Sequence, residues 1–172
     1  IEVQAEIVIR KHKLPHKFSE KALTEANSYP ESIADDKQRL DLRAVQHVTI
    51  DGETARDFDD AVAVEKTTRG WRLYVSIADV SYYVKPGSAL DREAYERGTS
   101  VYFPNRVVPM LPERLSNNLC SLVPNQPRPA FTAIMEFDRN GKRLTQKFSK
   151  STIISRYRLT YTIVKQILVD RN

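Results

Sequence analysis

Apolar and polar residues alternate in several short stretches of the chain, and such alternation predicts β-strands with one buried face. Residues 3–11 alternate in this way and are expected to form a half-buried strand. Further strands are predicted at residues 47–50, 61–65, 71–77, 101–103, 131–137 and 143–155. The last two flank Asn140-Gly141, a dipeptide typical of tight hairpin turns, so we expect them to pair as a hairpin.

Helices are predicted where a capping residue precedes apolar residues at helical spacing. They cover residues 20–27, 89–97, 113–118 and 160–169. Ser19 and Ser88 are suitable N-caps for the first two, and Gly98 suits the end of the second. Residues 28–40 are polar, have no clear period and predict a linker. Together the elements predict an α+β fold, with a mixed sheet and flanking helices, although their order does not give the topology.

Composition restricts the class of protein further. The chain has 172 residues, of which 41% are apolar and 28% are charged, as in ordinary globular proteins. No apolar run approaches the ~18–20 residues that a membrane helix needs, so no membrane association is expected. Cys120 is the only cysteine, which excludes an intrachain disulfide and a zinc site built from cysteine clusters. The first residue is Ile1 and no signal peptide follows it, which suggests an excerpt of a cytoplasmic protein.

The positive charge is concentrated near the C-terminus. The net charge of the whole chain is +5, whereas residues 138–172 contain nine basic and two acidic residues, a balance of +7. Such a segment is typical of proteins that bind a polyanion such as nucleic acid. A solvated basic surface without a partner is the other interpretation.

Four aspartates fall within ten residues, directly after a predicted strand: Asp51, Asp57, Asp59 and Asp60. Carboxylates this close repel one another when ionised. Phe58 interrupts the aspartates and the apolar residues 61–64 follow them, so the cluster is expected against the core, where unpaired charge is costly. A divalent cation would neutralise it, and hard carboxylate oxygens suit Mg²⁺ or Mn²⁺. The cluster therefore predicts metal-dependent hydrolysis of a phosphodiester.

Three other interpretations of the cluster are available. A calcium-binding helix–loop–helix motif fails, because neither Asp51 nor Asp57 begins a register that ends in the required glutamate. An acid–base pair of the glycosidase kind needs only two separated carboxylates, and this cluster is denser and more local. An exposed acidic loop without chemistry would not need the apolar residues that surround these aspartates.

The residues around the cluster resemble the active-site motif of the ribonuclease II/ribonuclease R family, in its RNB catalytic domain. The motif matches Thr49-Ile50-Asp51-Gly52-Glu53 and Arg56-Asp57-Phe58-Asp59-Asp60-Ala61. The resemblance continues in order through residues 77–84, 90–93, 97–104, 108–112, 115–122 and 158–161. It covers about residues 41–165, and so many blocks in the same order make the resemblance specific.

The resemblance implies a processive 3′-to-5′ exoribonuclease that degrades single-stranded RNA to nucleoside 5′-monophosphates with Mg²⁺, or with Mn²⁺ in its place. The family's metal ligands correspond to Asp51, Asp57 and Asp60. Asp59 corresponds to the residue whose loss stops cleavage, and Asp57 is expected to support catalysis as well.

Two tyrosines correspond to RNA-contacting residues of the family. Tyr102 matches the tyrosine that stacks on the 3′-terminal base, a sequence-tolerant way to hold single-stranded RNA. Tyr161 matches, more weakly, a tyrosine near the RNA path. Without the resemblance, Tyr102 would be interpreted as a core aromatic residue and Tyr161 as an ordinary helix residue.

The resemblance also implies a fragment. Residues 30–172 match the N-terminal part of the RNB domain, and residues 1–29 are expected to be the end of a preceding cold-shock domain with a linker. In the family, the second half of the catalytic domain supplies arginine and glutamate residues that complete the site. The chain alone is therefore expected to cleave RNA poorly.

Two functions of other classes remain as alternatives. One is an RNA-binding module that lacks catalysis, although such a module has no need for four crowded carboxylates beside phosphate. The other is a metal-binding structural domain without an RNA partner. The oligomeric state cannot be predicted from these patterns.

Three further residues carry weaker expectations. His47 is expected to be a core or surface residue rather than a metal ligand. Cys120 is expected to be a small core residue, because no base stands near it in the sequence. Asp79 suits either a hydrogen bond to the aspartate motif or an ordinary position at a strand end.

Overall fold

The computed structural model describes residues 2–104 and 106–170, which form two compact units. Residues 1–30 and 81–116 belong to the first, here called the helical unit. Residues 31–80 and 117–172 belong to the second, here called the barrel unit. The chain therefore passes from one unit to the other more than once, and all four aspartates of the motif belong to the barrel unit.

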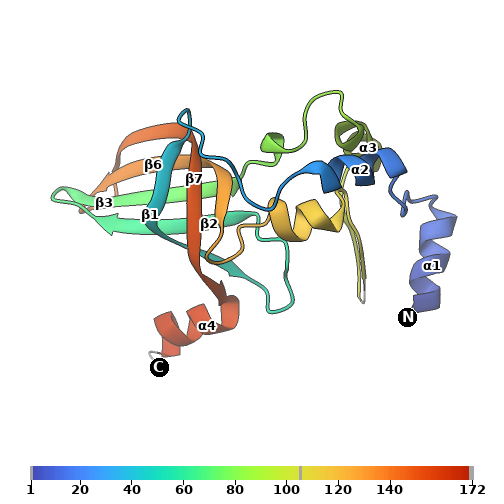
Figure 1. The fold of residues 1–172 in the computed structure, drawn as a ribbon. Helices are drawn as coiled ribbons and strands as arrows, with labels where there is room; N and C mark the ends of the chain where they lie inside the picture. The colour runs from blue at the N-terminus through green and yellow to red at the C-terminus, as the bar shows by residue number, and fades with distance from the viewer. Residues whose placement is uncertain (1, 105, 171–172) are drawn as a thin grey trace. The chain divides into compact units, whose positions relative to one another are not determined.

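The barrel unit is built on five strands that close into a barrel in the order β1-β2-β3-β6-β7 (Figure 1). The strands are β1 (Leu40–Asp51), β2 (Asp60–Lys66), β3 (Gly70–Ala78), β6 (Pro127–Asp138) and β7 (Arg143–Thr160). Neighbouring strands pair antiparallel, except that β1 and β7 close the barrel in parallel. The predicted α+β class and mixed sheet are confirmed, and closure into a barrel is an addition.

Tight turns set the register of the antiparallel strands. Between β2 and β3, the backbone N–H of Gly70 donates to the carbonyl of Thr67, and the N–H of Thr67 donates back to Gly70. Gly70 has φ +156°, and a Cβ there would lie 2.3 Å from the carbonyl oxygen of Phe137, so no larger residue fits. The predicted hairpin of β6 and β7 turns at Gly141, where φ is +80°.

The inside of the barrel combines an apolar cluster with buried polar side chains, four of which form a hydrogen-bonded line. Its apolar cluster contains Leu42, Val45, Phe58, Ala61, Ala63, Tyr74, Ala78, Leu122, Ala130 and Ile153. The polar line joins four buried side chains. Ser76 Oγ lies 3.0 Å from His47 Nε2 and 2.7 Å from Thr132 Oγ1, which lies 2.6 Å from Ser151 Oγ. We call these four residues the interior chain.

The helical unit contains α1 (Glu2–Lys11), α2 (Glu20–Ser28), α3 (Ala89–Arg97), β4 (Val101–Phe103) and β5 (Arg106–Val108). Ser19 and Ser88 cap α2 and α3 as predicted, each side chain accepting from a backbone N–H in the first turn. Gly98 follows α3 with φ +73°, and its N–H donates to the carbonyl of Ala94. The N-cap and C-terminal signals in the sequence thus give these helices correctly.

The predicted strand at residues 3–11 is wrong, because these residues form helix α1. Ala5 and Ile9 are buried, whereas Val3 and Ile7 are exposed. A spacing of four residues, from Ala5 to Ile9, fits one face of a helix as well as one face of a strand. Arg10 also pairs with Glu6 at the same helical spacing.

The remaining elements are short. They are η1 (Val80–Tyr82), η2 (Leu115–Leu119), α4 (Tyr161–Lys165) and η3 (Gln166–Asp170). η2 overlaps the helix predicted at residues 113–118 and ends one residue later, and α4 with η3 covers the helix predicted near the C-terminus. Residues 29–39 contain no helix or strand, as expected of a linker. Among the described helices, none has the length and apolarity needed to cross a membrane.

Candidate active-site loop

The aspartate motif forms the connection between two neighbouring strands of the barrel. Asp51 is the last residue of β1 and Asp60 is the first residue of β2, so Asp57 and Asp59 lie in the connection itself. Because β1 and β2 run antiparallel, the two ends of the motif come to the same end of the barrel. The motif therefore follows a strand, as the sequence predicts.

Phe58 fixes the middle of this loop. Its side chain is 5% exposed and belongs to the apolar cluster inside the barrel. Its backbone N–H donates to Ser121 Oγ at 2.9 Å, and its carbonyl accepts from the N–H of Leu122 at 2.9 Å. Asp57 and Asp59 consequently flank a buried, doubly hydrogen-bonded residue. The predicted contact with the core is made by Phe58, whereas Asp51 and Asp57 are partly buried and Asp59 and Asp60 are exposed.

Arg158 of β7 holds the start of the loop. Its guanidinium donates to the carbonyls of Gly52, at 3.0 Å, and Glu53. The same group lies 5.5 Å from the centre of the Phe58 ring. The Glu53 carboxylate accepts a hydrogen bond from the Thr162 hydroxyl in α4. The loop is therefore tied to the C-terminal end of β7 and to the helix that follows it.

The carboxylates of the loop repel one another. Burial raises the pKa of Asp51, and repulsion from Asp60 and Asp57 raises it further, against the opposing attraction of Arg158. Partial desolvation also raises the pKa of Asp59, with added repulsion from Asp57, Asp60 and Asp51. The folded chain thus holds these negative charges together at a free-energy cost.

The donor chemistry fits a hard divalent cation, although the carboxylates do not enclose one. Oδ2 of Asp51 is buried and has no hydrogen-bond partner among the described residues, a position that a cation would satisfy. Within residues 2–104 and 106–170, no three His, Cys, Asp or Glu side chains converge closely enough to hold a metal ion. Asp51, Asp57 and Asp60 are thus near enough to interact electrostatically but are not arranged as a closed ligand set.

The two tyrosines of the RNA prediction belong to different units. Tyr161 directly follows Thr160, whose backbone pairs with Asp51, so it begins α4 beside the start of the aspartate loop. Tyr102 lies in β4 of the helical unit, opposite Val107. Their exposed fractions are 65% for Tyr161 and 66% for Tyr102, so neither ring is a core residue.

Asp79 forms a buried ion pair that the sequence does not reveal. Its carboxylate lies 2.5 Å from the guanidinium of Arg39, and both side chains are almost completely buried. Arg39 also donates to the carbonyl of Ser151, which joins the linker to β7. The neighbouring residue Ala78 donates its N–H to the carbonyl of Asp59 at 2.8 Å. The pair therefore lies directly behind one end of the aspartate loop.

Cys120 and His47 are core residues, as expected. Burial, with repulsion from Asp59, raises the pKa of the Cys120 thiol to about 12, so this residue is no nucleophile at neutral pH. His47 is completely buried, and burial lowers its pKa. Its ring nitrogens are occupied by the Ser76 hydroxyl and the carbonyl of Val45, as fits a structural histidine.

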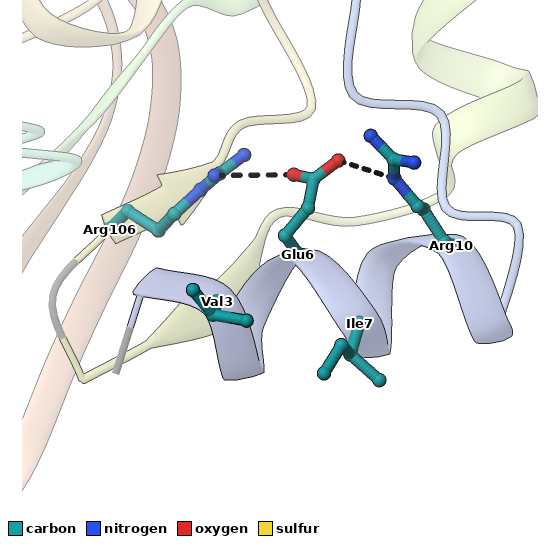
Figure 2. Close-up of a pocket in the computed structure, with 5 residues that line it drawn as sticks. All are labelled: Val3, Glu6, Ile7, Arg10 and Arg106. Carbon is teal, nitrogen blue, oxygen red and sulfur yellow. Dashed lines mark hydrogen bonds and ion pairs between the residues drawn. The ribbon is translucent and has the colours of Figure 1, made fainter.

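A surface pocket of about 420 Å³ lies in the helical unit, lined by Val3, Glu6, Ile7, Arg10 and Arg106. Figure 2 shows the Glu6 carboxylate between the two arginines. None of the motif aspartates lines this pocket, and its one carboxylate is already paired. We therefore place the candidate active site at the aspartate loop rather than here.

Sequence reasoning missed three residues that shape the loop: Arg39, Ser121 and Arg158. Each acts through a partner far away in the chain, and none belongs to a short motif with its partner. For Arg158 a weak signal exists, because it stands in the basic C-terminal segment shortly before Tyr161. Arg158 and Ser121 also lie within the blocks of the family resemblance, at 158–161 and 115–122, which give them no role, and Arg39 lies outside those blocks.

Comparison with known proteins gives a consistent family. A family model described as the RNB domain matches residues 39–172. Ribonuclease R of Vibrio cholerae is 49% identical over 169 residues, which are 96% of this chain and 21% of that protein. Ribonuclease R of Aquifex aeolicus is 47% identical over 170 residues, covering 97% of this chain and 24% of that protein. The chain thus spans only about a fifth to a quarter of these relatives.

Solved structures agree with the sequence comparison. Ribonuclease R of Mycoplasma genitalium, in complex with ribose-methylated single-stranded RNA, superposes with a TM-score of 0.91 at 35% identity, covering 99% of this chain and 27% of that one. A yeast pseudonuclease superposes with a TM-score of 0.70 at 21% identity, over 76% of this chain and 16% of that one, a likeness of fold alone. Because the family model matches most of its residues, this chain belongs to the RNB-domain family.

Proposed function

We propose that this chain carries the N-terminal part of the catalytic domain of a Mg²⁺-dependent 3′-to-5′ exoribonuclease. The reaction would add water to the phosphorus of the terminal nucleotide and break its bond to the preceding 3′ oxygen. Its products would be a nucleoside 5′-monophosphate and an RNA one nucleotide shorter with a free 3′ hydroxyl. We place this chemistry in the cytoplasm.

One observation carries the proposal: a buried phenylalanine fixes a loop of mutually repelling aspartates at the end of a barrel. The backbone of Phe58 is held by Ser121 and Leu122, so the positions of Asp57 and Asp59 on either side of it are fixed. A fold that only needed a soluble loop would not hold Asp51 and Asp59 where their pKa values are raised. The similarity to ribonuclease R supports the choice of RNA as substrate.

The residues of the loop would divide the work. Asp51, Asp57 and Asp60 would hold Mg²⁺, or Mn²⁺ in its place, with the unpartnered Oδ2 of Asp51 as the first ligand. Asp59 stands between Asp57 and Asp60 in the sequence and is repelled by both carboxylates. It would be required for cleavage, and Asp57 would support it. When bound, the cation would activate water and offset the charge of the phosphate.

Two exposed aromatic rings would guide the substrate. Tyr161 begins α4 next to the residue paired with Asp51, so it suits a position along the RNA path. Tyr102 on β4 would stack on the 3′-terminal base, which any base permits because every base has a π face. Single-stranded RNA follows as the substrate, since bases in a duplex are not free to stack on side chains.

The test compares the chain with its Asp59→Asn variant on 5′-labelled single-stranded RNA with Mg²⁺, resolved on a denaturing gel. A ladder that shortens from the 3′ end, and that the variant lacks, is the expected mark of the activity. Because the chain spans so little of its relatives, we expect weak cleavage, and the same pair of proteins should be tested in a chain extended to the relatives' length. Equal products from both proteins at that length would overturn the proposal.

The alternative of a catalytically incompetent RNA-binding module gives a different result in the same experiment. Such a module would bind RNA with equal affinity with and without Asp59→Asn and would release no monophosphate at either length. Titration of Mg²⁺ into the metal-free chain, followed by calorimetry, separates the two further, since only the nuclease needs the carboxylates of Asp51 and Asp60 to bind a cation.

A further inference from the structure

The outer surface of the barrel carries a group of exposed residues that the aspartate loop does not use. Ile77 on β3, Phe131 on β6, and Phe148 and Lys150 on β7 lie on this surface; we call them the outer platform. The exposed fractions of the two phenylalanines, 46% for Phe131 and 58% for Phe148, are high for rings that could have been placed inside.

Strand register places the outer platform in line with the active-site loop. Asp60 pairs with Ile77, Ile77 pairs with Phe131, and Phe131 pairs with Lys150. Directly paired residues of neighbouring strands point to the same face of a sheet. The row therefore runs across four strands from a carboxylate of the motif, over an apolar and an aromatic residue, to a lysine.

The two aromatic rings of the platform are nearly parallel. The ring centres of Phe131 and Phe148 are 6.3 Å apart and their planes differ by 12°. Phe148 lies on β7 opposite Ala133, two residues along the strands from the pair of Phe131 and Lys150 and on the same face. Two parallel exposed rings beside a cation are the parts from which proteins build platforms for unpaired bases.

The charge around the platform matches a polyanion. Lys142, Arg143, Lys147 and Lys150 all lie in or next to the N-terminal half of β7 and are exposed. Lys150 shares the face of Phe148, whereas Lys147 pairs with Ile134, which packs against the core, and therefore points to the other face. In the described part of the chain, none of these four forms an ion pair, whereas Arg69 and Arg72 both pair with Glu136 of β6. Cations left without acidic partners are available for phosphate.

We propose that the outer platform is a second RNA-binding surface, on which unpaired bases stack against Phe131 and Phe148 while Lys150 contacts the phosphate backbone. The inference rests on the proposed function for its choice of RNA as the partner. It goes beyond that function, because the surface lies outside the aspartate loop and uses neither Tyr102 nor Tyr161. A strand of RNA that crosses the row would pass from Lys150 over the aromatic rings toward Asp60.

Binding of a 5′-fluorescein oligouridylate, measured by anisotropy in EDTA, tests the platform without cleavage. Phe131→Ala/Phe148→Ala should weaken binding by roughly 5- to 150-fold, the range of losses when stacking residues are removed. Phe148→Leu should also weaken binding, because it keeps apolar area but loses the ring. Tyr95→Ala, which removes an 88% exposed aromatic residue from α3, is the matched control and should leave affinity unchanged.

Two further probes separate stacking from charge. An abasic oligomer of the same length should bind the parent chain and the double variant equally, since it has no bases to stack. The plot of log affinity against log salt has a negative slope, and Lys150→Gln should make it shallower by about 0.7, the value for one phosphate contact on a single strand. Circular dichroism and the melting temperature of each variant verify that it is folded.

Several outcomes would overturn the proposal. One is a double variant that binds oligouridylate as tightly as Tyr95→Ala does. Another is a double variant whose affinity for the abasic oligomer falls as much as its affinity for oligouridylate. A third is concentration-dependent self-association in sedimentation velocity that Phe148→Ala removes, which would make a second copy of the chain the occupant. Cleavage is scored separately, so an active chain with an indifferent platform would refute this surface and leave the proposed function standing.

Discussion

Two sets of polar side chains in the barrel differ in whether their polar groups are satisfied. The interior chain of His47, Ser76, Thr132 and Ser151 lies in the core, and each member has a hydrogen-bond partner. The aspartate loop lies at the end of the same barrel, where like charges repel and Oδ2 of Asp51 has no partner. Matched polar groups stabilise a fold, whereas crowded carboxylates cost free energy, which a bound cation would relieve.

The largest effect is expected from Phe58, which anchors the aspartate loop in the apolar cluster of the barrel. Phe58→Ala removes a ring from the apolar cluster and should lower the free energy of unfolding by about 3–5 kcal/mol, the usual cost of such a cavity. Urea denaturation measures this loss. Phe58→Leu fills most of the volume and should cost less than about 1.5 kcal/mol. A loss below about 1 kcal/mol for the alanine variant would show that the loop is not anchored in the core.

The interior chain can be broken at its centre. Thr132→Val keeps the shape but removes the hydroxyl that lies between Ser76 and Ser151, so their buried hydroxyls lose a partner. We expect a loss of about 1–3 kcal/mol in unfolding free energy. Thr145→Val, at an exposed position of β7, is the matched control and should change stability little. Equal effects of the two substitutions would mean that the interior chain contributes nothing specific.

Local patterns in the sequence predicted most of the fold and the position of the loop. Alternation predicted the strands because most of them have one face inside the barrel, and Ser19 and Ser88 marked helix starts through hydrogen bonds that span three residues. The position of Phe58 between aspartates predicted a cluster against the core. The same kind of pattern misled at α1, where Ala5 and Ile9 fit either period.

Long-range partners could not be predicted in this way. Arg39 and Asp79 are 40 residues apart, and Ser121 is 63 residues from the backbone N–H that it holds. Nothing in the local sequence of Arg39 distinguishes a buried arginine from a solvated one. The closure of β1 on β7, which brings Arg158 to the loop, also depends on pairing between distant segments. The carboxylates were therefore identified from sequence, whereas the residues that position them were not.

The interior chain should make stability depend on pH through His47. Burial lowers the pKa of this residue below its usual value of 6.5. Below pH 6.5 the unfolded chain therefore takes up a proton that the folded chain refuses, and unfolding is favoured. The stabilisation is complete above pH 6.5 and declines toward the lower folded pKa, by at most about 1.4 kcal/mol per pH unit. Unfolding measured from pH 7.5 to 5.5 should show this decline, and His47→Gln should flatten it. An equal slope in that variant would place the titration elsewhere.

The smallest effect has the opposite sign and tests the loop itself. Because burial and repulsion raise the pKa of Asp51, its ionised carboxylate destabilises the fold at neutral pH, and the cost disappears as the pH falls through that raised pKa. Asp51→Asn should therefore stabilise the metal-free chain, by ~0.5–1 kcal/mol.

Asp41→Asn is the contrasting control, since Arg43 lowers the pKa of Asp41 to about 2 and removal of that carboxylate brings no gain in stability. Saturating Mg²⁺ should raise the melting temperature of the parent chain and reduce its difference from Asp51→Asn, because the cation relieves the same repulsion that the substitution removes. If Asp51→Asn is instead less stable than the parent without metal, the Asp51 carboxylate is stabilised by partners within the folded chain, as the interior chain is. The repulsion in the loop would then not indicate a cation site.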